Sequence, residues 1–298
     1  MLPVTVIGGY LGAGKTTLVN QLLRHADGLK LAVLVNEFGA LPIDEDLIEA
    51  QDDKIMSIAG GCICCSYGDD LAQAMIDLGQ SDRRPDHILV EASGVAIPGA
   101  IAASISTMPG LQVDGVVILA DAETIRDQAD NEYIGDTIER QLADADMVLL
   151  NKCDLVERRY LDDLQPWLEA KASDATVVRV HHSKVPNAIV LQQHAWREAV
   201  AKAEFHPHAD AFESRIIPFA KECDAEMVAK TLADPRFRLI RAKGFVPTPA
   251  GMRAVHVVGR RWAVSEAPAG AAAGVVVIAE KQGSRISSIG SFLEENAL

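Results

Sequence analysis

The stretch that decides the fold of this 298-residue chain is Gly9-Tyr10-Leu11-Gly12-Ala13-Gly14-Lys15-Thr16. Two bracketing glycines followed by a lysine and a hydroxyl residue have the spacing of a phosphate-binding loop. An apolar run at 4–7 precedes the loop, and an amphipathic pattern at 16–25 follows it. Strand, loop and helix in this order predict a P-loop NTPase domain. The residues expected around the phosphates are Gly9, Gly12, Ala13, Gly14, Lys15, Thr16 and Thr17.

The backbone and two side chains of the loop have expected roles in binding the nucleotide. The backbone N–H groups bind phosphate, and Lys15 reaches the β- and γ-phosphates. The Thr16 hydroxyl is an expected Mg²⁺ ligand. The helix that begins near Lys15 adds the positive end of its dipole.

Short apolar runs alternate with helical patterns through the first two thirds of the chain. Runs of β-branched residues separated by helices predict a mostly parallel sheet covered on both faces. We therefore predict an α/β P-loop GTPase domain at 1–184. Its expected strands are 4–7, 30–35, 87–91, 115–120, 147–150 and 176–180, and its expected helices include 16–25, 71–78 and 133–143.

The rest of the chain has a different pattern. Residues 185–210 carry two prolines and predict a linker, with a helix around 189–202. The remainder, 211–298, predicts a smaller α+β domain in which hairpin-connected strands form an antiparallel sheet with helices on one face. Its expected strands are 212–218, 238–242, 254–258, 262–264 and 275–279, and its expected helices are 225–232 and 286–296.

The composition limits the class of partner. With 49% hydrophobic and 23% charged residues the chain is typical of soluble globular proteins, and its net charge of −14 disfavours nucleic acid and anionic membranes. The apolar run at 267–279 is too short to span a bilayer. No signal-like segment precedes the first predicted strand. We therefore expect a cytoplasmic protein, in which clustered thiols stay reduced.

A second motif, Asn151-Lys152-Cys153-Asp154, follows the predicted strand 147–150. Asp154 can accept hydrogen bonds from both the N1–H and the 2-amino group of guanine, whereas adenine has neither donor. A site built around such a bond rejects the analogue that lacks it by about 10⁴-fold. Asn151 is expected to brace the loop and Lys152 to cover the base. The motif therefore predicts GTP and GDP as ligands.

Two further segments are expected to sense the γ-phosphate. Glu91, at the end of a strand, is a candidate Mg²⁺ ligand, and Gly94 lets a backbone N–H approach the phosphate. The other segment is 36–39, followed by Asp44, which is our candidate for orienting the attacking water. A solvated loop acid is the alternative for Asp44. The predicted catalytic residues are thus Lys15, Asp44 and Glu91.

Three of the five cysteines, Cys62, Cys64 and Cys65, fall within four positions. Thiolates favour Zn²⁺, Cu⁺ and related soft ions. Gly60 and Gly61 are expected to form a turn that lets the thiols converge. Three thiolates leave one tetrahedral position for Glu37, a water or a client ligand. The alternative is a set of packed or redox-active cysteines.

Taken together, these motifs resemble the CobW-like metallochaperone GTPases, relatives of the urease and hydrogenase nickel-insertion GTPases. The resemblance rests on 8–17, 36–39, 61–65, 91–94, 151–154 and 241–245. It implies slow GTP hydrolysis, Mg²⁺ dependence, and binding of zinc, or alternatively cobalt, at the C-x-C-C cysteines. It also implies delivery of the metal to a client metalloprotein. The chain departs from the family pattern at Gly60, at Ile97 and in Ser66-Tyr67-Gly68 after the cysteines, and lacks a histidine-rich tract.

We therefore predict a GTPase in which nucleotide state and metal affinity are coupled. One alternative is a GTP-gated regulatory protein whose cysteines sense redox state. A P-loop small-molecule kinase is the other, and the guanine-reading motif argues against it. The sequence does not identify the client, and it is compatible with a homo-oligomer.

Overall fold

The computed structural model describes residues 1–26, 28–36, 55–60, 75–76, 78–79, 84–191, 212–268, 270–281 and 285–296. At 36, 55–60, 291 and 294–296 only the backbone is described. The chain divides into two compact units, Met1–Ser173 with Val177–Leu191, and Asp174–Thr176 with Gln192–Leu298. Among the described helices, none is long and apolar enough to cross a membrane.

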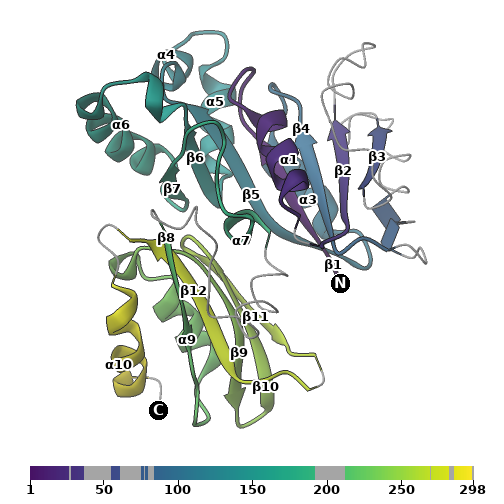
Figure 1. Ribbon diagram of the computed structural model, residues 1–298, viewed down its shortest axis with the longest axis vertical. Helices are drawn as coiled ribbons and strands as arrows, with labels where there is room; N and C mark the ends of the chain where they lie inside the picture. The colour runs from purple at the N-terminus through teal and green to yellow at the C-terminus, as the bar shows by residue number, and fades with distance from the viewer. Residues whose placement is uncertain are drawn as a thin grey trace. The chain divides into compact units, whose positions relative to one another are not determined.

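The first unit is built on a seven-stranded sheet in the order β3-β2-β4-β1-β5-β6-β7 (Figure 1). Neighbouring strands from β3 to β6 pair in parallel. Continuous burial along β1, β4 and β6 explains their uninterrupted apolar sequences, because helices cover both faces of the sheet. The strands are β1 Leu2–Gly8, β2 Leu31–Asn36, β3 Ile55–Gly60, β4 His87–Ala92, β5 Leu111–Asp121, β6 Met147–Asn151 and β7 Thr176–Arg179.

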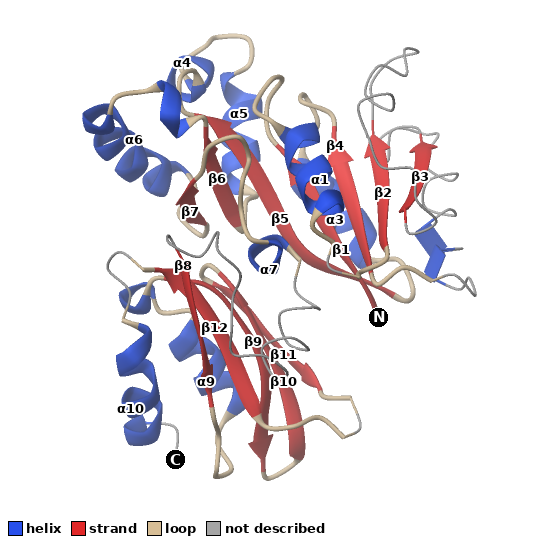
Figure 2. Ribbon diagram, viewed as in Figure 1, coloured by secondary structure: helices blue, strands red, loops and turns tan. Residues whose placement is uncertain are grey.

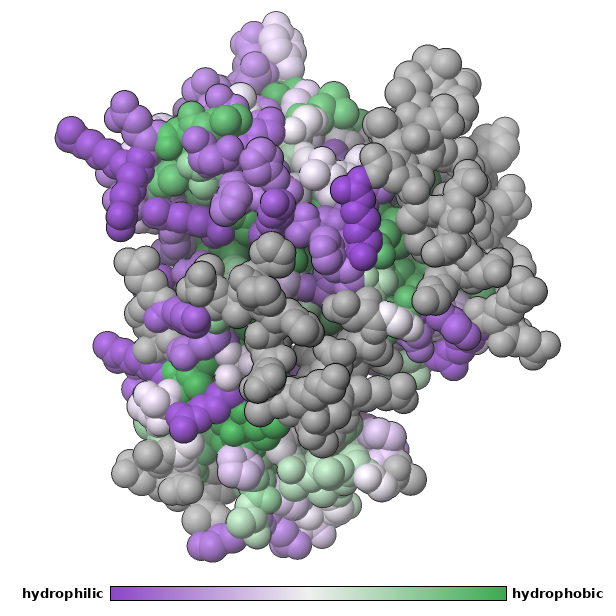
Figure 3. Space-filling model, viewed as in Figure 1, coloured by the Kyte–Doolittle hydropathy of each residue, from purple (hydrophilic) through white to green (hydrophobic). Residues whose placement is uncertain are grey.

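Helices lie on both faces of this sheet. In Figure 2, α1 lies in front of the sheet, and α3 and α5 lie behind it. Right-handed crossovers require this, because the chain moves from β1 toward β2 in one direction and from β4 toward β5 in the other. Figure 3 shows hydrophilic side chains gathered over α6, whose outer residues are exposed. The helices are α1 Lys15–Arg24, α3 Pro98–Ser106, α4 Ile125–Ala129, α5 Gly135–Ala143, α6 Arg158–Lys171 and α7 Asn187–Val190.

The predicted α/β class is confirmed, and each strand predicted for the first domain is present. The sequence analysis missed β3, and it was wrong about Gly60. That glycine is the last residue of β3, where it pairs with Asn36 of β2, instead of forming a turn. Of the predicted helix 71–78, only 75–76 and 78 are described, and they are helical. In the predicted helix 189–202, α7 ends at Val190, and 192–202 lie outside the described residues.

The register aligns the carboxyl ends of three strands. Asn36 at the end of β2 pairs with Gly60 of β3 on one side and with Ala92 of β4 on the other. Neighbouring strands lie about 4.8 Å apart. The chain therefore leaves the sheet toward residues 37, 61 and 93 at three adjacent positions of one edge.

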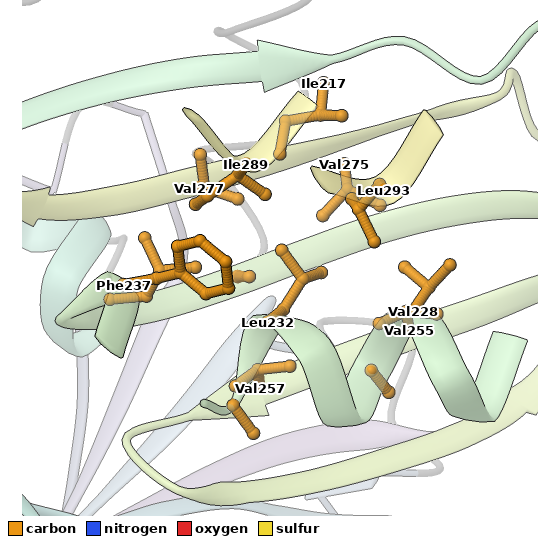
Figure 4. Close-up of a cluster of buried hydrophobic side chains, with 14 of the residues drawn as sticks. Ile217, Val228, Leu232, Phe237, Val255, Val257, Val275, Val277, Ile289 and Leu293 are labelled. Carbon is orange, nitrogen blue, oxygen red and sulfur yellow. The ribbon is translucent and has the colours of Figure 1, made fainter. Parts of the chain in front are cut away.

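The second unit contains the antiparallel sheet that the sequence predicts, and its five strands lie in the order β11-β10-β9-β12-β8. Two helices, α9 Ala225–Leu232 and α10 Ile286–Asn296, share one core with the sheet. Figure 4 shows Leu232 of α9 and Leu293 of α10 beside valines of β10 and β12 in that core. The strands are β8 Phe212–Ile217, β9 Leu239–Thr248, β10 Gly251–Val258, β11 Arg261–Glu266 and β12 Gly274–Glu280.

Candidate functional site

The predicted phosphate loop joins β1 to α1 at the carboxyl edge of the parallel sheet. Gly9, Gly12 and Gly14 have φ angles of 125, 76 and 105°, which residues with a side chain rarely adopt. Gly14 is also the N-cap of α1, where no side chain caps the helix. The backbone N–H groups of the first turn are thus available to a phosphate group, as a helix N-terminus requires.

The loop already positions its lysine. The Lys15 ammonium group is buried and donates to the Tyr10 carbonyl oxygen at 3.2 Å. This hydrogen bond holds the Lys15 side chain along the loop in which it is expected to bind phosphate. Ala13 is buried in the loop, whereas Thr17 is exposed at the start of α1.

The two predicted Mg²⁺ ligands, Thr16 and Glu91, lie in contact. The Thr16 hydroxyl donates to Glu91 Oε1 at 2.8 Å, and Glu91 is only 3% exposed. The contact follows from the topology, since β1 and β4 are neighbours and Ile7 pairs with Glu91. A hydroxyl and a carboxylate beside a phosphate loop are the hard oxygen ligands that Mg²⁺ prefers. These residues therefore fit the ion that the sequence predicts.

The predicted guanine-reading motif at 151–154 is hydrogen-bonded directly to the phosphate loop. Asn151 Nδ2 donates to the Ala13 carbonyl oxygen at 2.9 Å and to Ser183 Oγ at 3.0 Å. Asn151 Oδ1 accepts from the Ser183 N–H at 2.9 Å, and Ser183 Oγ donates to the Gly14 carbonyl oxygen at 3.0 Å. A Cβ on Gly14 would lie 2.5 Å from Asn151 Nδ2, so only glycine leaves room for this network.

Ser183 also belongs to this site, although it lies outside the motifs named in the sequence analysis. It is fully buried, and both it and His182 have left-handed backbones, with φ of 53 and 51°. Non-glycine residues hold such angles only where surrounding contacts fix them. The hydrogen bonds to Asn151 and Gly14 are those contacts, and they join three separate segments into one site.

Lys152 and Asp154 of the motif each lie beside an ionisable side chain. Lys152 Nζ lies 2.6 Å from Asp121 Oδ2, at the end of β5. Asp154 Oδ2 lies 3.7 Å from His182 Nε2, and both side chains are exposed, so this pair contributes little to stability. The sequence analysis missed Asp121, although an acid directly after an apolar strand at the carboxyl edge is a usable signal.

Gly94 lies against the tip of the phosphate loop. A Cβ at this position would lie 2.7 Å from Leu11 Cδ2 and 2.8 Å from the Leu11 backbone nitrogen. The segment predicted to sense the γ-phosphate therefore touches the loop that binds phosphate.

The remaining predicted residues, Glu37, Asp44, Cys62, Cys64 and Cys65, lie outside the described residues. Within the part of the chain that the structure describes, no group of three or more His, Cys, Asp or Glu residues could hold a metal ion. The two described cysteines are poor ligands, because burial raises the pKa of both the Cys153 and the Cys223 thiols.

Comparison with known proteins identifies relatives for nearly the whole chain. The family described as CobW/HypB/UreG, nucleotide-binding domain, matches residues 3–179. A protein named zinc chaperone CobW from Sinorhizobium sp is 31% identical, over 89% of this chain and 90% of that protein. Zinc chaperone YjiA of Escherichia coli is 30% identical, over 82% of this chain and 81% of that protein.

The fold is shared as well. The crystal structure titled Zn(II)-bound YjiA GTPase from E. coli covers 99% of this chain and 98% of its own, with a TM-score of 0.50 and 22% identity. The family match spans more than half of the chain. This chain belongs to the CobW/HypB/UreG family.

Proposed function

We propose that this chain is a slow GTPase and metallochaperone that binds zinc, or alternatively cobalt, and delivers it to a client metalloprotein. The proposed metal ligands are Cys62, Cys64 and Cys65, with Glu37, a water or the client in the fourth position. Support comes from the family, from relatives that are named zinc chaperones, and from the nucleotide site described above. We further propose domains at 1–184 and 211–298, a linker at 185–210, and a cytoplasmic location.

In the proposed nucleotide site, each residue has a role in binding the phosphates, the base or Mg²⁺. The loop N–H groups and Lys15 bind the phosphates, and Asn151 holds the base motif against the loop. Asp154 accepts from the guanine ring, which its exposure permits once His182 moves aside. Thr16 and Glu91 would hold Mg²⁺, which neutralises charge on the β- and γ-phosphates when bound. Asp44 is our candidate for orienting the attacking water.

One observation carries the coupling between nucleotide and metal. The chain leaves the sheet toward Glu37, toward Cys62 and toward Gly94 at adjacent positions, because Asn36 pairs with both Gly60 and Ala92. The end of β2, which leads toward Glu37, pairs with the end of β3, which leads toward Cys62. Coupling then arises from contacts that differ between two states, without a chemical step on the metal.

The test is the zinc affinity in each nucleotide state. A competing chelator measures the zinc Kd with GDP and with a non-hydrolysable GTP analogue, and we expect the two values to differ. Because coupling is reciprocal, zinc must change the ratio of analogue to GDP affinity by the same factor. Equal zinc Kd values in both states would refute the coupling.

Replacing Cys62, Cys64 and Cys65 by serine tests the metal site itself. We expect loss of bound zinc with GDP affinity unchanged, because the cysteines lie apart in sequence from the nucleotide motifs. The matched control is Cys223→Ser in the second unit, which removes a thiol whose Sγ donates to the Pro247 carbonyl oxygen. Zinc content that survives the triple replacement would contradict the chaperone proposal and favour the regulatory alternative.

A further inference from the structure

The geometry points to Gln141 of α5 as a positioning residue that holds the 93–96 turn in place for the γ-phosphate. The inference rests on the proposed GTPase function and adds a residue that none of the nucleotide motifs contains. Gln141 lies on the buried face of α5, beside Leu142, and is 1% exposed. A polar side chain this deeply buried must have hydrogen-bond partners.

The turn is closed by its own backbone. The Ala96 N–H donates to the Ser93 carbonyl oxygen at 3.0 Å, which places Gly94 and Val95 at the tip. Gly94 is buried against Leu11 of the phosphate loop, while Val95 is exposed.

Gln141 holds this turn through two hydrogen bonds. Its Nε2 donates to the Gly94 carbonyl oxygen at 3.1 Å and to the Ala96 carbonyl oxygen at 2.8 Å. An amide nitrogen has two hydrogens, so both are used on the same turn. A carboxylate or an apolar side chain of the same length could make neither bond.

A second residue of the same helix end holds the segment further along. Asp144 Oδ2 accepts from the Gly99 N–H at 3.1 Å, in the first turn of α3. An acidic side chain at a helix N-terminus is favourable. The segment from Gly94 to Gly99 is thus fixed to the end of α5 at both of its ends, and at Gly94 it also touches the phosphate loop.

This arrangement has a consequence for nucleotide selection. A sensor that is already ordered does not lose conformational entropy when the γ-phosphate arrives, so binding is stronger than for a loose loop. GDP has no γ-phosphate and gains nothing from the turn. Gln141 therefore contributes to the preference for GTP over GDP and leaves GDP binding unaffected.

Gln141→Met is the test, since methionine has a similar length and no donor. We measure the Kd for a fluorescent GDP and for a fluorescent non-hydrolysable GTP analogue in wild type and variant. We expect the analogue to bind about 30-fold more weakly, as the loss of two buried hydrogen bonds implies, with GDP binding unchanged. The control is Gln128→Met on α4, whose amide donates to Thr124 Oγ1, and both affinities should stay as in wild type.

The outcomes separate the two proposals. An unchanged ratio of analogue to GDP affinity, or an equal loss of both, would overturn the role of Gln141 while wild-type binding upholds the GTPase. Wild-type protein that binds no GTP analogue would overturn both. If Gln141→Met does not fold, Gln141→Asn withdraws the same amide by one methylene, and the same ratio decides.

Discussion

Asn151 is the residue whose removal tests the nucleotide site most directly. Asn151→Ala deletes the hydrogen bonds to the Ala13 carbonyl oxygen and to both the N–H and the Oγ of Ser183. Asn151 is 3% exposed, so water does not easily replace these partners. We expect the phosphate loop and the 182–183 segment to lose their connection, and the affinity for nucleotide to fall.

The magnitude follows from the three bonds. Each contributes about 1 kcal/mol net, so the braced arrangement loses about 3 kcal/mol. If nucleotide binds only the braced arrangement, the GDP Kd rises by about 100-fold, because about 1.4 kcal/mol corresponds to a factor of ten. Asn151→Asp keeps the acceptor for the Ser183 N–H but replaces both donors by a carboxylate oxygen that faces the Ala13 carbonyl oxygen, and we expect a loss of at least about 30-fold.

Titration with fluorescent GDP measures this loss, and a melting curve on the same sample shows whether the variant is folded. Asn131→Ala is the matched control, because Asn131 Oδ1 accepts from Tyr133 N at 2.9 Å in an exposed turn away from the site. A folded Asn151→Ala protein with the GDP affinity of wild type would refute the bracing role.

Two further predictions concern the metal of the nucleotide site and the described thiols. Thr16→Val removes the hydroxyl that donates to Glu91, so Mg²⁺ should raise GTP affinity about tenfold less than in wild type. Titrations with Mg²⁺ and with a chelator measure this, and an undiminished Mg²⁺ effect would exclude Thr16 as a ligand. Cys153 and Cys223 should alkylate more slowly in the folded protein than in urea, because a raised pKa lowers the thiolate fraction near pH 8. Mass spectrometry of the labelled peptides measures the alkylation rates, and equal rates in the folded protein and in urea would contradict the burial of these thiols.

Local pattern was enough to predict most of the fold. The helices 225–232 and 286–296 coincide with α9 and α10, because an apolar face repeats at helical spacing in each. β3 was missed because Ile55–Gly60 contains Ser57, Ala59 and Gly60, which have low strand propensity. Among the described strands, β3 lies at the end of the sheet order, beside β2. Its formation therefore depends on a neighbour that local sequence does not reveal.

The site was predicted as motifs but not as contacts. The sequence places Asn151 and Gly14 in a nucleotide site, yet their link through Ser183 depends on β6 lying two strands from β1. Gln141 shows most clearly that the sequence does not predict such contacts. The helical pattern included it, but only the position of α5 behind the sheet shows that its amide meets a turn 45 residues earlier in the chain.

The strand order is the basis for proposing that one edge of the sheet serves both nucleotide and metal. β1 and β4 are neighbours, which brings Thr16 to Glu91, and β4, β2 and β3 follow in sequence across the sheet. In the proposed coupling, the 93–96 turn after β4 stays fixed, and a displacement at the end of β2 reaches the end of β3 directly, because Asn36 pairs with Gly60. If β3 instead lay beyond β7, the cysteine segment would leave the sheet far from Gly94, and nucleotide state could not reach it through adjacent strands. The pairing of Asn36 with Gly60 and Ala92 is thus the structural basis for expecting GTP and zinc to influence each other.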